Sequence, residues 1–208
     1  MVVLLHGYGA SGDDLVGLAE ELSTALPDAS FLVPGGPHRV AVTGRAWVPD
    51  FRAPSRADYA VRLAVEVEET SKLVWKVIDE ARDRGARCGD IYVGGFSQGG
   101  RMAAEVALRA PQDCDLGGVI VMSGGGFKEV ELPSATDRVP MRVLVTHGSA
   151  DRVVRIGLGK ATAQHFAELG HDVRWLQFVG PHTIPPEVRA AIPAFVQGEA
   201  VGLPLDQP

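Results

Sequence analysis

The sequence predicts an α/β fold in which helices cover both faces of a mostly parallel, six-stranded sheet, giving three layers. Two observations support this prediction. Short β-branched runs alternate with longer segments of helical periodicity, and most of these runs are continuously apolar, as in parallel strands buried on both faces. The expected strands are Val2–Leu5, Ser30–Val33, Asp90–Gly94, Gly118–Met122, Arg142–Thr146 and Val173–Phe178.

Five helices are expected between these strands, because apolar side chains recur there at spacings of three and four. Ser11 or Asp13 is a candidate cap for the first helix, and Gly85 stands where the second should end. Pro186 suits the first turn of the last helix. The expected helices are Asp14–Leu26, Asp58–Arg84, Gly99–Arg109, Leu158–Leu169 and Pro186–Val196.

The 208 residues have the length of one domain, which we place at residues 1–197, with a loose tail at residues 198–208 that is rich in Pro and Gly. A net charge of −6 gives no reason to expect nucleic acid as a partner. No apolar run has the roughly 18–20 residues that cross a bilayer, and no signal peptide is evident. We therefore expect a cytoplasmic protein. Cys88 and Cys114 are expected to be reduced structural thiols.

The run Gly95-Phe96-Ser97-Gln98-Gly99 follows one expected strand and opens a helix. A sharp turn of this kind holds its serine in a strained backbone conformation, and the glycines on either side remove side chains that would clash. The serine hydroxyl then projects above the sheet, beside the positive end of the helix. We expect Ser97 to be a nucleophile.

Serine needs a base that is itself oriented by an acid, and in this architecture the chain order is serine, acid, histidine. Asp151 follows the fifth expected strand and His182 follows the sixth, so both lie at the same edge of the sheet as Ser97. Asp137 and Glu131, in the preceding loop, are weaker candidates for the acid. The order predicts a catalytic triad of Ser97, Asp151 and His182.

The other histidines fit the role of base less well. Two precede the serine, one precedes the acid, one lies in a helical stripe and one lies at the opposite end of the sheet. These are His6, His38, His147, His165 and His171. We expect the third of them, His147, to hydrogen-bond within its own loop.

The run Gly7-Tyr8-Gly9-Ala10-Ser11-Gly12 matches the dinucleotide-binding pattern G-x-G-x-x-G. That fold also needs an acid at the end of the next strand, which here runs into Pro34-Gly35-Gly36. The alternative interpretation is an oxyanion loop, in which the backbone N–H groups of Tyr8 and Gln98 hold the negative charge of a tetrahedral intermediate. We favour this loop over a nucleotide-binding oxidoreductase, since it also explains the serine.

The long connection Gly35–Ala57 carries two aromatic residues, Trp47 and Phe51. Long loops at the carboxyl ends of parallel strands build ligand sites, so we expect both residues to bind substrate.

Four motifs in this order resemble the phospholipase/carboxylesterase family, which includes bacterial carboxylesterases and acyl-protein thioesterases. They are His6-Gly7-Tyr8-Gly9, Gly94 to Gly100, His147-Gly148 followed by Asp151-Arg152-Val153-Val154, and His182-Thr183-Ile184-Pro185. The resemblance implies an α/β-hydrolase fold without a large cap domain and without metal or cofactor. It implies hydrolysis of short- to medium-chain acyl esters through an acyl-enzyme, with Ser97, Asp151 and His182 as the triad and Trp47 near the acyl group.

The sequence departs from that family at three points. The hairpin that usually precedes the first strand is missing, so either the sheet is smaller by two strands or the start is late. Arg155 replaces a usual Pro, and Pro181 replaces a usual Gly before the histidine. The expected partner is a small-molecule ester or thioester, and a homodimer stays open. The alternative functions are a thioesterase for acyl-proteins or acyl-CoA, and a non-catalytic binding module.

Overall fold

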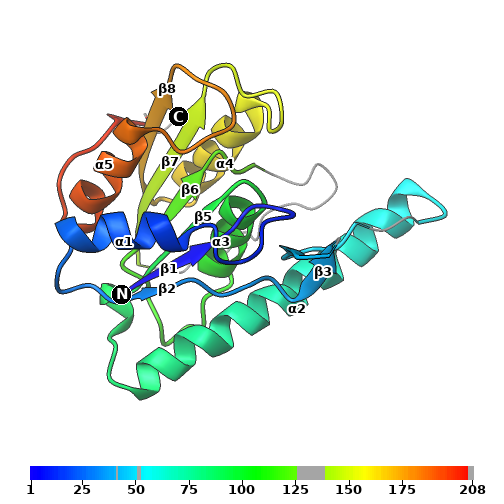
Figure 1. The fold of residues 1–208 in the computed structure, drawn as a ribbon, viewed down its shortest axis with the longest axis horizontal. Helices are drawn as coiled ribbons and strands as arrows, with labels where there is room; N and C mark the ends of the chain where they lie inside the picture. Colours follow the sequence, from blue (N-terminus) through cyan, green and yellow to red (C-terminus); the bar gives the residue numbers. More distant parts are fainter. Residues whose placement is uncertain (41, 51–52, 126–138, 206–208) are drawn as a thin grey trace.

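The computed structural model describes residues 1–40, 42–50, 53–125 and 139–205 of the chain. Its centre is one seven-stranded sheet in the order β2-β1-β5-β6-β7-β8-β9, in which every neighbouring pair is parallel except β8 and β9 (Figure 1). The strands are β1 (Val2–Leu5), β2 (Phe31–Leu32), β5 (Tyr92–Phe96), β6 (Gly118–Met122), β7 (Arg142–Gly148), β8 (Asp172–Phe178) and β9 (Leu203–Pro204). The predicted mostly parallel sheet and all six of its strands are confirmed.

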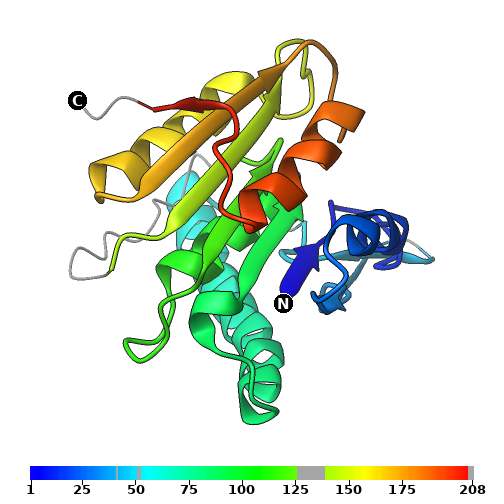
Figure 2. The same cartoon turned by 90° about the vertical axis from the view of Figure 1, so that its left-hand side faces the viewer.

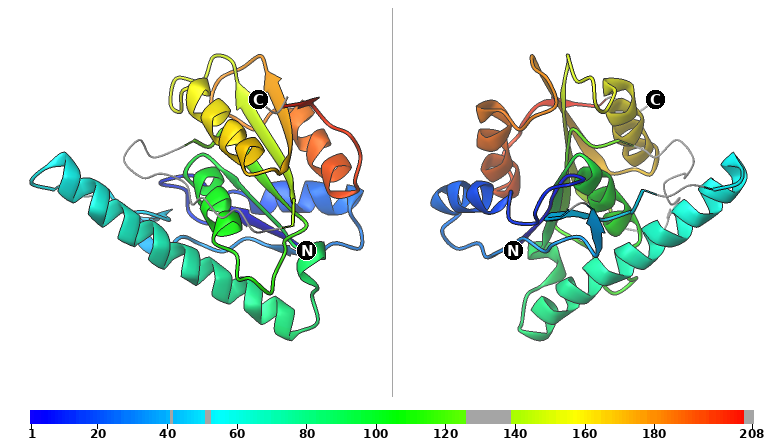
Figure 3. Two further views of the ribbon diagram at one scale, coloured as in Figure 1. Left: turned by 180° about the vertical axis from the view of Figure 1, so that it is seen from behind. Right: turned by 45° about the vertical axis from the view of Figure 1, so that its right-hand side comes forward.

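Helices cover both faces of this sheet, so the predicted three layers are present (Figure 3). Helices α1 and α5 lie on one face, and α2, α3 and α4 lie on the other. Although α2 is 28 residues long, no helix in the described ranges has both the length and the apolar character needed to cross a membrane. The helices are α1 (Val16–Ala25), α2 (Arg56–Asp83), α3 (Gln98–Leu108), α4 (Ile156–Glu168) and α5 (Pro186–Val196).

Each face of the sheet has its own hydrophobic core, because side chains alternate along a strand. In β1, Val2 and Leu4 face α1 and α5, whereas Val3 and Leu5 face the core under α2 and α3. All four side chains are fully buried, which explains why the strand reads as a continuous apolar run.

Two short elements were not predicted. The tail that we expected to be loose carries β9, whose Leu203 pairs with Trp175 of β8 in an antiparallel register (Figure 2). The connection between β2 and α2 contains a hairpin of β3 (His38–Val40) and β4 (Gly44–Ala46). Both elements are only two or three residues long, too short for a periodic pattern to stand out in the sequence.

The first helix begins later than predicted. Leu15 occupies its N-cap position without a side-chain hydrogen bond, so neither Ser11 nor Asp13 caps it. At the edge of the sheet beside β1 lies the short strand β2.

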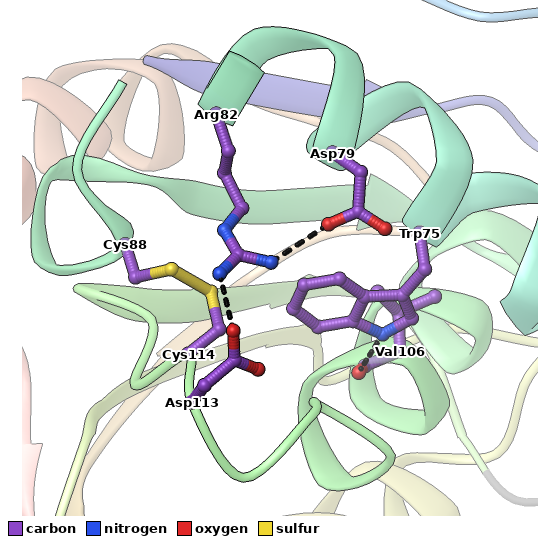
Figure 4. Close-up of a disulfide and its surroundings, with 7 residues drawn as sticks. All are labelled: Trp75, Asp79, Arg82, Cys88, Val106, Asp113 and Cys114. Carbon is purple, nitrogen blue, oxygen red and sulfur yellow. Dashed lines mark hydrogen bonds and ion pairs between the residues drawn. A yellow bond between two sulfur atoms is a disulfide. The ribbon is translucent and has the colours of Figure 1, made fainter. Parts of the chain in front are cut away.

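The structure contradicts the prediction of two reduced thiols, since Cys88 and Cys114 form a disulfide (Figure 4). Cys88 lies in a 3-10 turn (Cys88–Asp90) just before β5, and Cys114 lies shortly before β6. The sequence places them 26 residues apart, but β5 and β6 are parallel neighbours, so their amino-terminal ends meet. Arg82 lies beside the disulfide and its guanidinium donates to Asp113 over 2.7 Å.

Candidate active site

Ser97 joins β5 to α3 in a strained backbone conformation, with φ 56° and ψ −118°. In the part of the chain that the structure describes, only Ser123 is a second non-glycine residue with positive φ. Hydrogen bonds hold this geometry: the Ser97 N–H donates to the Met122 carbonyl (2.9 Å), and the Arg101 N–H donates to the Ser97 carbonyl (3.1 Å). Strain of this kind persists only where the surrounding structure enforces it.

The two flanking glycines are required by close backbone contacts. A Cβ on Gly95 would lie 2.2 Å from the Gly99 carbonyl oxygen, and a Cβ on Gly99 would lie 2.0 Å from the Leu5 carbonyl oxygen. No side chain fits at either position without moving the backbone. The predicted sharp turn around Ser97, with glycines that remove clashes, is confirmed.

The structure brings together the other two residues of the predicted triad. His182 Nδ1 lies 2.6 Å from Asp151 Oδ2, and the Asp151 side chain is completely buried. The His182 ring also packs on Phe96, the residue before Ser97, with ring centroids 4.6 Å apart. His182 therefore lies between the buried acid and the serine turn. The alternative acids, Glu131 and Asp137, lie outside the described residues.

Asp151 is held as a carboxylate by several hydrogen bonds. Burial alone would raise the pKa of Asp151. The hydrogen bonds from His182 and from the Val154 and Val153 amides, together with the charge of His182, outweigh this effect and lower the pKa. Both amides donate to Oδ1 over 2.9 Å, while His182 uses Oδ2. His147 donates from Nε2 to the Val154 carbonyl (2.8 Å), as expected for a histidine that stabilises its own loop.

The loop after β1 lies against the serine. A Cβ on Gly7 would be only 3.5 Å from the Ser97 Cβ. The next residues are fixed to β4, because the Gly9 N–H donates to the Arg45 carbonyl (2.8 Å) and the Arg45 N–H donates to the Ala10 carbonyl (2.7 Å). Among the described residues no backbone carbonyl accepts from the Tyr8 N–H.

Gln98 is the first residue of α3, so its N–H belongs to the first turn, where amides have no intrahelical acceptor. Of the two amides predicted for the oxyanion hole, that of Gln98 directly follows Ser97, and that of Tyr8 directly follows Gly7, which approaches the Ser97 side chain. The position of the Gln98 amide at a helix N-terminus also favours negative charge.

Trp47, one of the two aromatic residues expected to bind substrate, is buried. Its side chain is 2 % exposed and belongs to the core beneath α2 and α3. Phe51 lies outside the described residues. The expected acyl contacts of these two aromatics remain predictions.

The hydrogen bonds of two polar side chains at the site, Gln98 and His6, were not predicted. The Gln98 side-chain amide binds the backbone of Trp47 and Val48, and the fully buried His6 ring binds backbone groups on both of its sides. The position of His6 directly after a buried strand and before Gly7 was the available signal. No group of three or more His, Cys, Asp or Glu side chains in the described ranges is arranged to hold a metal ion.

Comparison with protein families gives one model across almost the whole chain. The model described as Phospholipase/Carboxylesterase matches residues 1–198. Acyl-protein thioesterase 1 of Yarrowia lipolytica is 30% identical over 189 residues, which cover 86% of this chain and 82% of the relative. Carboxylesterase SOBER1 of Arabidopsis thaliana is 29% identical, with 86% of this chain and 81% of the relative covered.

Solved structures share the fold. Esterase PE8 superposes with a TM-score of 0.77 and 28% identity, covering 94% of this chain and 90% of the other. SOBER1 of Arabidopsis thaliana superposes with a TM-score of 0.76 at 24% identity, over 94% of this chain and 96% of the other. The layered sheet and its helices therefore recur in proteins of similar length.

Proposed function

We propose that this chain, which belongs to the Phospholipase/Carboxylesterase family of α/β-hydrolases, cleaves carboxylic esters with Ser97 as nucleophile, His182 as base and Asp151 as orienting acid. Family membership and the carboxylesterase relatives confirm the sequence-based prediction of a carboxylic ester hydrolase. The assignment to these three residues rests mainly on one observation. His182 lies 2.6 Å from the buried Asp151, and its ring packs on Phe96 in the strained turn that carries Ser97.

In the first half of the reaction, the hydrogen bond to Asp151 keeps a proton on His182 Nδ1 and leaves the Nε2 lone pair free. His182 Nε2 takes the Ser97 proton while Ser97 Oγ attacks the acyl carbonyl carbon. The carbonyl electrons move to oxygen, which accepts hydrogen bonds from the Tyr8 and Gln98 amides. The protonated His182 then gives its proton to the leaving alcohol as the C–O bond breaks.

In the second half, water hydrolyses the acyl-enzyme. His182 takes a proton from water, the resulting hydroxide adds to the acyl carbon, and the same two amides hold the second oxyanion. Collapse of this intermediate returns the proton to Ser97 Oγ and releases the carboxylic acid. These steps use only residues of the chain, an ester and water.

A thioesterase is the second candidate, supported by relatives described as acyl-protein thioesterase 1. The same triad serves both reactions, because a thiol leaves in place of an alcohol. We propose that the substrates carry short- to medium-chain acyl groups. We also propose that residues 1–197 form a single domain. Rates on ester and thioester substrates with the same acyl chain distinguish the two functions: the larger kcat/KM identifies the preferred leaving group.

Location and assembly stay predictions. The cytoplasm was expected from the sequence, but the Cys88–Cys114 disulfide favours an oxidising compartment, since cytosolic thiols are kept reduced. Alkylation of free thiols at the moment of cell lysis, followed by mass spectrometry, tests which applies. Three further points stay predictions: that the protein forms a homodimer, that it has no nucleic acid partner, and that Trp47 and Phe51 contact the acyl chain.

Kinetics of two serine variants test the assignment of the nucleophile. Ser97→Ala should lower kcat for p-nitrophenyl butyrate by several orders of magnitude. Ser123→Ala is the matched control, because Ser123 also has positive φ and its buried hydroxyl has no hydrogen-bond partner among the described residues. The control should keep nearly wild-type kcat. Near wild-type turnover by Ser97→Ala would refute the proposal.

A further inference from the structure

The two amides of the proposed oxyanion hole belong to separate segments of the chain. Tyr8 lies in the loop after β1, and Gln98 lies at the start of α3. The spacing between their N–H groups must match one oxyanion, and small errors in such spacing are costly to catalysis. Three buried or partly buried side chains connect the segments: His6, Trp47 and Gln98.

The connection begins at the Gln98 side chain. Its Oε1 accepts from the Trp47 N–H over 2.8 Å, and its Nε2 donates to the Val48 carbonyl over 2.9 Å. Both ends of the amide are therefore used, so its orientation is fixed. Gln98 therefore has two roles. Its backbone supplies one amide of the proposed oxyanion hole, and its side chain is hydrogen-bonded to the segment after β4.

Trp47 carries the connection to the other segment. Its indole Nε1–H donates to the His6 carbonyl over 2.8 Å, and the indole and imidazole centroids are 5.0 Å apart. Thr70 of α2 donates from Oγ1 to the Trp47 carbonyl over 2.7 Å. With its N–H, carbonyl and indole N–H all bonded, the buried Trp47 is held on three sides.

His6 completes the connection at the oxyanion loop. The Gly36 N–H donates to His6 Nε2 over 2.8 Å, so the ring proton lies on Nδ1, which donates to the Gly7 carbonyl over 2.7 Å. The Gly7 carbonyl and the Tyr8 N–H belong to one planar trans peptide unit, in which they point in opposite directions. By fixing the Gly7 carbonyl, His6 therefore also fixes the direction of the Tyr8 N–H.

From these contacts we infer that Trp47 is a positioning residue, which sets the spacing of the Tyr8 and Gln98 amides through His6 and the Gln98 side chain. The inference rests on the proposed function, since it concerns the oxyanion hole of the same reaction. It gives Trp47 a role that is compatible with its burial.

The decisive variant is Trp47→Phe, which keeps a large aromatic ring but removes the Nε1–H. Trp75→Phe is the matched control, because Trp75 is buried and donates from Nε1 to the Val106 carbonyl over 2.9 Å (Figure 4). Val106 lies near the end of α3 that is opposite to Ser97. Both variants lose one buried indole hydrogen bond and should lose similar thermal stability. Only Trp47→Phe should disturb the oxyanion hole.

Two measurements distinguish a positioning role of Trp47 from a general loss of protein stability. Both are corrected for the concentration of active sites, which is determined by titration. For p-nitrophenyl butyrate, Trp47→Phe should lower kcat roughly tenfold to hundredfold, with KM changed less than about twofold. For an aryl trifluoromethyl ketone, which forms a tetrahedral oxyanion with serine, the inhibition constant should rise by a similar factor. Trp75→Phe should leave kcat and the inhibition constant unchanged.

Gln98→Met provides a second variant in case Trp47→Phe does not fold. It keeps the backbone N–H that binds the oxyanion but loses both side-chain hydrogen bonds, and it should show the same two effects. Wild-type kcat and inhibition constant in the folded variants would overturn the inference while leaving the triad intact. Full activity of Ser97→Ala would instead overturn the proposed function, so the two failures are distinguishable.

Discussion

His182 Nδ1 and Asp151 Oδ2 lie 2.6 Å apart, although the two residues are 31 positions apart in the sequence. The sheet explains this short distance. Strands β7 and β8 are parallel neighbours, so their carboxyl ends lie at the same edge of the sheet, and β5 also ends there, directly before Ser97. A short contact with a fully buried carboxylate fixes the imidazole tautomer.

Asp151→Asn should lower kcat by about 10³- to 10⁴-fold with little change in KM, because an amide cannot hold the Nδ1–H tautomer as a carboxylate does. The measurement is steady-state hydrolysis of p-nitrophenyl butyrate. Asp172→Asn is the matched control, since Asp172 is exposed at the start of β8 and pairs with Arg174. A loss of less than tenfold in Asp151→Asn would show that another acid orients His182.

The lowered pKa of Asp151 predicts a pH dependence of stability. A carboxyl with a lower pKa in the folded state stabilises the fold above its unfolded pKa, near 3.9, and this contribution disappears as pH falls through the folded value. The difference in the free energy of unfolding between wild type and Asp151→Asn should therefore shrink from pH 5.5 to pH values below about 4. Urea unfolding at several pH values measures it. A difference that grows on acidification would contradict the assigned direction.

The strained backbone of Ser97 predicts different stabilities for two inactive variants. Ser97→Gly should be more stable than Ser97→Ala by about 1 kcal/mol, because glycine adopts φ 56° without steric strain and alanine does not. Denaturant unfolding of both variants tests this. Equal stabilities would mean that the turn is not strained in solution.

The Cys88–Cys114 disulfide should stabilise the fold without contributing to catalysis. Closing a loop of this size is worth about 3 kcal/mol, so the Cys88→Ser/Cys114→Ser variant should unfold at a lower temperature. Its kcat should stay near that of the wild type, since the disulfide lies at the amino-terminal ends of β5 and β6. Thiol titration of the denatured, unreduced protein should detect no free thiol. Two free thiols and an unchanged unfolding temperature would contradict the prediction.

The parts of the molecule that could be predicted from the sequence share one physical cause. Strands buried on both faces leave continuous apolar runs, and the order of residues at their carboxyl ends predicted that Asp151 and His182 would lie together at the edge where Ser97 follows β5. What could not be predicted depends on contacts between distant segments. Predicting the disulfide would have required knowing that β5 pairs with β6. Predicting the proposed role of Trp47 would have required knowing its contacts with the side chains of Gln98 and Thr70.

Phosphonylation by a fluorophosphonate tests the central claim most directly. The reagent reacts with a serine only when a base activates it and an oxyanion hole receives the developing charge. After treatment of the native protein, peptide mass spectrometry should place one phosphonyl group on Ser97, and hydrolysis of p-nitrophenyl butyrate should be lost in proportion. Complete labelling of another residue, or full activity after Ser97 is labelled, would contradict the account.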